Sequence, residues 1–252
     1  PYRIGTTSYI YPEEILFNVE KLKERVDDIE LLFFDAESFP SKKLMDKLKL
    51  LSLRYDFSYT VHLPLELKLA DADLKVRASS VDKITRFIER TAYLESYAYI
   101  LHIDSISGML RNPDLIALWR KNARESVEDI LKNVSVRPSL ICVENLDYPL
   151  DLLDDIIEDF KLSVCLDIGH MAQYGYDILK YCRKYIRKTR VIHISGINAS
   201  GIHSSLKNLD EKNIKKLKKY LADVQYKGLL TLEIFSETDL KESLEIMCGR
   251  KG

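Results

Sequence analysis

Residues 164–170 read Val-Cys-Leu-Asp-Ile-Gly-His, an apolar run with an aspartate and a histidine towards its far end. Short apolar runs of this kind are typical of buried parallel strands. A carboxylate inside such a run is costly to bury unless it is paired or bound to a cation. The stretch therefore predicts a strand whose carboxyl end carries chemistry, and the rest of the chain repeats the pattern.

Runs of the same type, rich in Val, Ile, Leu, Phe or Tyr, recur along the whole chain. We predict eight strands, at residues 3–9, 29–35, 58–64, 99–104, 140–146, 164–170, 190–196 and 229–235. Helical patterns follow them, at residues 12–26, 41–54, 74–93, 114–132, 150–160, 176–186, 210–224 and 238–248. Eight strand–helix repeats in about 250 residues predict a (β/α)8 barrel, the TIM barrel of the α/β class. An open doubly wound sheet is the alternative, although no Gly-x-Gly-x-x-Gly turn follows the first strand.

The composition fits a single barrel domain over residues 1–252, with 46% hydrophobic and 31% charged residues. Lys and Arg number 38 and Asp and Glu 39, so the net charge is −1 and we expect no nucleic acid as a partner. Apolar runs stay well short of 18 residues and no signal-peptide pattern opens the sequence, so we expect no membrane partner and a cytoplasmic location. The four cysteines lack Cys-x-x-Cys spacing and are predicted to be reduced core residues. The oligomeric state stays open.

All five histidines fall at or just after the carboxyl ends of predicted strands, where (β/α)8 barrels carry their chemistry. Three carboxylates join them late in apolar strands. The predicted metal ligands are His62, His102, Glu144, Asp167, His170, His193, His203 and Glu233. Imidazole and carboxylate without thiolate suit a divalent transition metal, Zn, Mn, Fe or Co, and argue against a closed structural zinc site. Bridging carboxylates allow one to three ions a few ångströms apart.

A second set of residues at the same barrel end is predicted to contact a small-molecule substrate. These residues are Asp35, Glu37, Asp104, Tyr9 and Tyr174. Asp104 has the strand parity of His102, so we expect it to point inward and to orient an imidazole. The tyrosines lie in loops at the carboxyl ends of strands, where aromatic side chains would form an apolar binding wall.

The order of the predicted ligands resembles that of the xylose isomerase-like barrels. It runs His on the third and fourth predicted strands, Glu on the fifth, Asp-x-x-His on the sixth, His on the seventh and Glu on the eighth. That superfamily contains apurinic-site endonucleases and sugar isomerases and epimerases. The resemblance implies metal positions at Glu144, Asp167, His193 and Glu233, with His62, His102 and His170 completing a multi-metal cluster. Residues 201–203 read Gly-Ile-His where the endonucleases have Asp-x-His, which argues against a third metal and against DNA repair.

Five segments are also similar to the CbiR family of cobamide-remodelling hydrolases. They are residues 3–10 (Arg-Ile-Gly-Thr-Thr-Ser-Tyr-Ile), 26–31 (Val-Asp-Asp-Ile-Glu-Leu), 60–65 (Thr-Val-His-Leu-Pro-Leu), 143–146 (Val-Glu-Asn-Leu) and 164–170. This resemblance implies a metal-dependent hydrolase, a phosphodiesterase that cleaves the nucleotide loop of cobamides, the B12-type cofactors, for corrinoid remodelling.

The catalytic residues are predicted to be Glu144 and Glu233. For hydrolysis, Glu144 would bridge the metals, and Glu233 would be either a ligand or the base that takes a proton from water. The alternative function is a sugar or sugar-phosphate isomerase or epimerase, in which the same two carboxylates shuttle a proton. A corrinoid carrier without catalysis is a third interpretation. A ligand cluster that also engages His62 and His102 favours hydrolysis.

Overall fold

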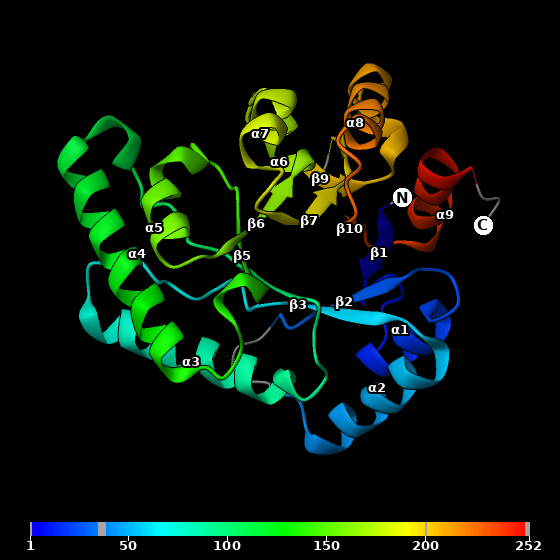
Figure 1. The fold of residues 1–252 in the computed structure, drawn as a ribbon, viewed down its shortest axis with the longest axis horizontal. Helices are drawn as coiled ribbons and strands as arrows, with labels where there is room; N and C mark the ends of the chain where they lie inside the picture. Colours follow the sequence, from blue (N-terminus) through cyan, green and yellow to red (C-terminus); the bar gives the residue numbers. More distant parts are fainter. Residues whose placement is uncertain (1, 35–38, 200, 250–252) are drawn as a thin grey trace.

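The computed structural model describes residues 2–34, 39–199 and 201–249. Eight parallel strands close into a barrel in the order β1-β10-β7-β6-β5-β4-β3-β2. They are β1 (Arg3–Thr7), β2 (Asp28–Leu32), β3 (Ser58–His62), β4 (Ala98–Leu101), β5 (Ile141–Glu144), β6 (Ser163–Asp167), β7 (Thr189–Ile194) and β10 (Leu229–Leu232). Helices surround these strands (Figure 1), so the predicted (β/α)8 barrel is confirmed.

Helices occur in the predicted regions, but their first and last residues differ from the predicted ones. They are α1 (Ile15–Leu22), α2 (Lys42–Tyr55), α3 (Leu74–Ala92), α4 (Pro113–Asn133), α5 (Asp154–Asp159), α6 (Ile168–Gln173), α7 (Ile178–Tyr185), α8 (Glu211–Asp223) and α9 (Glu237–Cys248). Short 3₁₀ helices are η1 (Met109–Arg111), η2 (Pro138–Leu140), η3 (Leu150–Leu153) and η4 (Leu206–Asn208). Side-chain caps fix several starts; the Ser41 hydroxyl accepts a hydrogen bond from the Leu44 N–H at 3.2 Å. None of the described helices is both long and apolar enough to cross a membrane.

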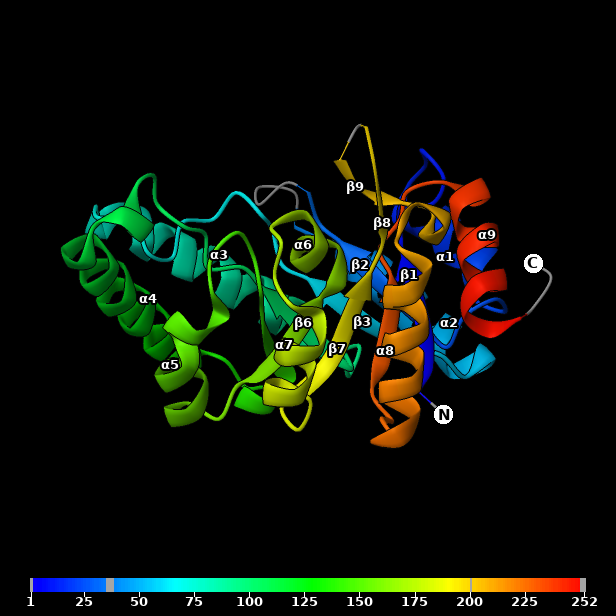
Figure 2. The same ribbon diagram turned by 90° about the horizontal axis from the view of Figure 1, so that it is seen from above.

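Two elements at the carboxyl ends of the strands differ from the prediction. The strand predicted over residues 164–170 ends at Asp167, and α6 begins at the next residue. The Asp167 carboxylate accepts a hydrogen bond from the His170 N–H at 2.8 Å, so the aspartate caps α6. A small antiparallel hairpin, β8 (Gly196–Asn198) and β9 (Gly201–Ser204), follows β7 and carries His203. Figure 2 shows α6 and this hairpin at the end of the barrel opposite to the N-terminus.

A small cluster of apolar side chains, here called the plug, fills the barrel interior and shows which strand positions face inward. Its buried residues are Ala98, Ile100, Cys142, Cys165, Val191 and Leu229. Side chains alternate along a strand, so residues two positions after plug residues also face inward. Glu144, Asp167 and His193 follow plug residues in this way on β5, β6 and β7. Of the four cysteines, three are buried as predicted, whereas Cys248 at the end of α9 is exposed.

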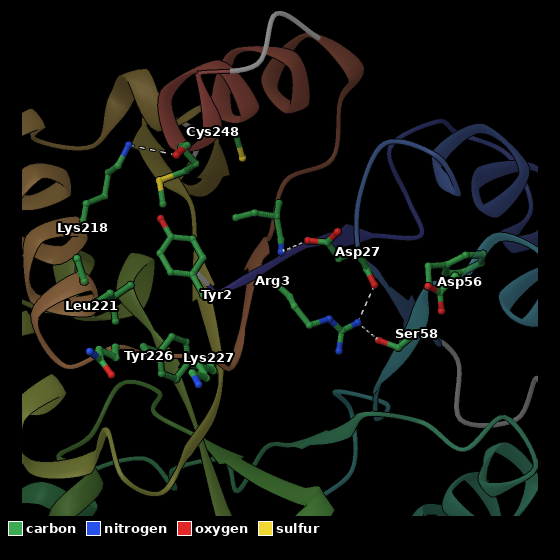
Figure 3. A pocket seen from close by; sticks show the side chains of 15 residues that line it. Tyr2, Arg3, Asp27, Asp56, Ser58, Lys218, Leu221, Tyr226, Lys227 and Cys248 are labelled. Carbon is green, nitrogen blue, oxygen red and sulfur yellow. Dashed lines mark hydrogen bonds between the residues drawn. The ribbon is translucent and has the colours of Figure 1, made fainter.

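The amino end of the barrel holds a separate polar arrangement. Arg3 Nη2 donates hydrogen bonds to the Asp27 carbonyl at 2.7 Å and to Ser58 Oγ, and Ser58 in turn donates to the fully buried carboxylate of Asp28. A cavity of about 1240 Å³ opens here, lined by residues of β1, α8 and α9. Figure 3 shows Arg3 and Lys218 on its walls. This cavity lies away from the predicted ligands.

Asp28 gives the protein a pH-dependent stability. Burial raises the pKa of Asp28 from 3.8 to about 7, so the folded protein holds this proton more tightly than the unfolded chain does. The wild type should therefore lose stability as the pH rises from about 4 to about 7. The Asp28→Asn variant has no carboxyl group to titrate and should not lose stability in this way. Between about pH 4 and pH 7, its unfolding free energy relative to that of the wild type should therefore rise by on the order of 4 kcal/mol. Urea unfolding at several pH values measures it; parallel curves for the two proteins would contradict the assignment.

Candidate metal centre at the carboxyl ends of the strands

Two of the groups of potential ligands at the carboxyl ends of the barrel strands contain most of the predicted residues. The first consists of His62, His102 and Glu144, and the second of Glu144, Asp167, His193 and Glu233. Within each group, one ligand atom per residue lies within 4.8 Å of all the others. Both groups contain Glu144. Because a carboxylate has two oxygens, Glu144 can serve two neighbouring cations at once.

Four buried atoms of the second group lack hydrogen-bond partners among the described residues. They are Glu144 Oε1, Asp167 Oδ2, His193 Nδ1 and Glu233 Oε2. His193 Nδ1 lies 3.5 Å from Glu144 Oε1 and 3.3 Å from Glu233 Oε2, so these atoms face one another. Buried polar atoms without partners are rare and costly, and a divalent cation would satisfy all four. The donor set of one imidazole and three carboxylates suits a divalent transition metal.

Backbone carbonyls orient three of the histidines. His62, His170 and His203 each donate an Nδ1–H hydrogen bond to a carbonyl oxygen, at 3.0, 3.0 and 3.2 Å. A carbonyl only accepts, so Nε2 becomes the lone-pair nitrogen of each neutral ring. His102 reaches the centre through Nε2 as well, which lies 2.8 Å from Glu144 Oε2.

Burial and nearby charged groups strongly shift the pKa values of the carboxyl groups in the centre. Burial favours the neutral form of Glu144, but the charges of His102 and His193 outweigh it and hold the pKa of Glu144 well below its usual range. Burial raises the pKa of Asp167 well above its usual range, and the carboxylates of Glu233 and Glu144 add to the rise. Because several carboxyl groups are buried close together, a bound cation would be favoured at this site.

Asn145, a residue that the sequence analysis missed, fastens β5 to β6 beside the centre. Its side chain accepts a hydrogen bond from the Asp167 N–H at 2.7 Å and donates one to the Asp167 carbonyl at 3.0 Å. The Asn145 carbonyl is the acceptor for His170 Nδ1. Asn145 follows the predicted ligand Glu144 directly, which was the only signal in the sequence.

Replacing Asn145 by alanine should destabilise the protein and loosen Asp167. The change leaves the buried N–H of Asp167 without a partner, at a cost of about 1–3 kcal/mol, and removes one hydrogen bond from its carbonyl. Urea unfolding of the metal-free variant measures this loss. An Asn145→Ala variant as stable as the wild type would show that water replaces the amide and that these two bonds do not hold Asp167.

Glu30 on β2 is a second residue that the sequence analysis missed. It is fully buried, its Oε2 lies 2.9 Å from His193 Nε2, and it forms a further possible ligand group with His62 and Glu233. Glutamate inside an apolar strand is the same signal that pointed to Glu144. Here that signal was present in the run Asp-Ile-Glu-Leu of residues 28–31.

His170 and His203 lie at the edge of the centre. His170 Nδ1 is 3.3 Å from Asp167 Oδ2, and His203 Nδ1 is 3.5 Å from Glu233 Oε2. Their ring centroids are 6.5 Å apart. Over residues 2–34, 39–199 and 201–249, the groups with three or more ligand atoms close together contain neither histidine. Their role as metal ligands stays a prediction.

The predicted substrate-contact residues take different positions. Asp104 lies beyond the end of β4 at Leu101 and pairs with Lys68, and its roles in contacting substrate and in orienting an imidazole stay predictions. Tyr9 is exposed and packs edge-on against Phe34, with ring centroids 4.9 Å apart. Tyr174 is exposed, with its ring 6.2 Å from that of His170. Asp35 and Glu37 lie outside the described residues.

A closed parallel barrel with histidines and carboxylates gathered at its carboxyl ends defines a class of (β/α)8 proteins with a candidate metal centre. Residues 20–249 match the family model described as the xylose isomerase-like TIM barrel, and the chain belongs to this family. Proteins named as endonucleases and as sugar epimerases are both among those similar to this chain.

Similar curated proteins and solved structures come from both branches. Two proteins named "Probable endonuclease 4", from Acholeplasma laidlawii and Mycoplasmoides gallisepticum, are 24% and 27% identical over 47% and 49% of this chain. The matches span 42% of the length of each. A D-tagatose 3-epimerase-like protein superposes with a TM-score of 0.79 at 23% identity, covering 97% of this chain and 95% of its own. Endonuclease IV from Thermus thermophilus gives 0.76 at 15% identity, covering 98% and 100%. At these identities the structures establish the fold.

Proposed function

We propose that this protein is a metal-dependent phosphodiester hydrolase that cleaves the nucleotide loop of cobamides. The observation that carries the hydrolytic part is the sharing of Glu144 by two ligand groups, one with His62 and His102 and one with three further residues. Two cations held side by side suit phosphoryl transfer, because they stabilise both the attacking and the leaving oxygen. A single-metal isomerase site would not need the first group.

Residues of the two ligand groups would have two roles, binding cations and accepting a proton. When bound, divalent cations would supply Lewis acidity, lowering the pKa of a water and offsetting charge on the phosphoryl oxygens. Glu144 would hold the two cation positions together. Glu233, with its buried Oε2 unpartnered, would complete the second group or accept the proton of the attacking water. His170 and His203, whose rings are fixed through Nδ1, would line the edge of the centre where the phosphodiester binds.

The cobamide substrate is supported by the sequence segments that resemble cobamide-remodelling hydrolases. Three of them, residues 60–65, 143–146 and 164–170, contain residues of the two ligand groups. The exposed aromatic side chains of Tyr9 and Phe34, together with Phe235 next to His203, would offer an apolar surface to a bulky corrinoid.

A small molecule, rather than nucleic acid, is the substrate we propose, although proteins named endonucleases are among the relatives. The net charge of −1 does not favour a polyanion. Gly201 also stands where the endonuclease pattern has a carboxylate. Tests for hydrolysis should nevertheless include DNA with abasic sites.

A sugar epimerase is the second candidate. It is favoured by the group of Glu144, Asp167, His193 and Glu233, because a single cation there would leave two carboxylates beside a bound sugar. Such a site would exchange a substrate proton with solvent, whereas a phosphodiesterase would not.

Incubation of the metal-loaded protein with adenosylcobalamin, followed by mass spectrometry of the corrinoid products, tests the proposal. We expect release of a cobinamide species that has lost its lower base, and no such release by a Glu144→Gln variant. Parallel incubations contain ketohexoses in deuterated water and a DNA duplex with an abasic site. Deuterium incorporation or DNA cleavage without a corrinoid product would refute the proposed substrate.

A further inference from the structure

The contact between Glu30 and His193 is the least expected feature of the metal centre. Both side chains are fully buried, and Glu30 Oε2 lies 2.9 Å from His193 Nε2. The two residues come from β2 and β7, which are not neighbours in the barrel, so the contact crosses its interior. A carboxylate acceptor at Nε2 favours the proton on that nitrogen.

In this contact His193 uses Nε2, whereas other histidines of the centre form their hydrogen bonds through Nδ1. His62, His170 and His203 each hold the proton on Nδ1 through a backbone carbonyl. In the neutral form that can ligate a metal, His193 instead presents Nδ1 as its lone-pair nitrogen. That atom is buried without a hydrogen-bond partner among the described residues, and it faces the unpartnered oxygens Glu144 Oε1 and Glu233 Oε2.

We propose that Glu30 is a positioning residue that holds His193 in its Nε2–H form and aims Nδ1 at the cation position. The inference rests on the metal-binding part of the proposed function and is independent of the substrate. Carboxylates that accept from the second nitrogen of a ligating histidine fix the ring and increase its basicity. Without Glu30, His193 Nε2–H would be buried without an acceptor, and the ring could carry its proton on Nδ1 instead.

The test compares Glu30→Gln with a matched control, Asp28→Asn. Both positions are fully buried carboxylates that lie two residues apart on β2, and Asp28 contacts Ser58 at the amino end of the barrel. Glutamine keeps the shape of Glu30, but its amide group can donate to Nε2 and so stabilise the wrong proton position on His193. Zn²⁺ affinity is measured by competition with a chelator, and circular dichroism confirms that each variant is folded.

We expect Glu30→Gln to bind Zn²⁺ about 10- to 100-fold more weakly than the wild type, and Asp28→Asn to bind it like the wild type. Equal Zn²⁺ affinity of Glu30→Gln and the wild type would overturn the inference while leaving the metal centre in place. A wild type that binds no Zn²⁺ would instead refute the proposed function as well, so the two failures are distinguishable.

A second measurement uses only the wild type and so does not depend on the variant's folding. Long-range ¹H–¹⁵N correlation spectra of the Zn²⁺-loaded protein show which nitrogen of each histidine carries the proton. We expect Nε2–H for His193 and Nδ1–H for His62. A His193 proton on Nδ1 would overturn the inference.

Discussion

Glu144→Gln should abolish hydrolysis, with kcat/KM lower by about 10³-fold or more. The reason is that Glu144 belongs to both ligand groups, so its loss weakens both cation positions. Losing several kcal/mol of transition-state stabilisation by the cations corresponds to at least about a thousandfold in rate. The variant should still fold, because glutamine has the shape of glutamate and removes a buried charge.

Asp28→Asn is the control for this variant, since it also replaces a fully buried carboxylate in the barrel but at the opposite end. Steady-state kinetics with adenosylcobalamin should show normal turnover for Asp28→Asn. Turnover by Glu144→Gln within about tenfold of the wild type, a loss of only about 1.4 kcal/mol, would show that the shared carboxylate is not central to the reaction.

Removal of the metal should lower the thermal stability of the folded protein. Without a cation, the carboxylates of Glu144, Asp167 and Glu233 are buried close together with unpartnered oxygens among the described residues. Zn²⁺ at 100 times its dissociation constant should stabilise the protein by about 2.7 kcal/mol for one site. For a chain of this size, that corresponds to a rise in Tm of about 5–10 °C.

Calorimetry of chelator-treated protein with and without added Zn²⁺ measures the change. Glu144→Gln should show a much smaller rise, which separates binding at the centre from adventitious binding elsewhere. A Tm that does not respond to Zn²⁺ in the wild type would contradict the assignment of Glu144, Asp167, His193 and Glu233 as ligands.

The barrel and most of the centre were predictable because both depend on local patterns. Apolar runs with strand parity identify the strands, and a carboxylate late in such a run identifies Glu144, Asp167 and Glu233. The sequence does not show that β4 ends at Leu101, so His102 and Asp104 both lie beyond the strand that was predicted to carry them.

The missed features depend on contacts between distant segments. The proposed role of Glu30 depends on its contact with His193 across the barrel interior, which the sequence does not show. The start of α6 depends on the Asp167 cap and on close packing, since a Cβ on Gly169 would lie 2.6 Å from Ser195 Oγ of the segment after β7. No pattern within residues 164–170 contains that second contact, so the run was predicted to stay extended to His170.

The number of metal ions bound per chain tests the central claim of a shared two-cation centre most directly. Elemental analysis is made on the wild type and on a His62→Ala/His102→Ala variant, each loaded with Zn²⁺ and freed of excess. The account predicts two ions in the wild type and one in the variant, with hydrolysis lost in the variant. A single ion in both proteins would contradict the account and favour the one-metal chemistry of an epimerase.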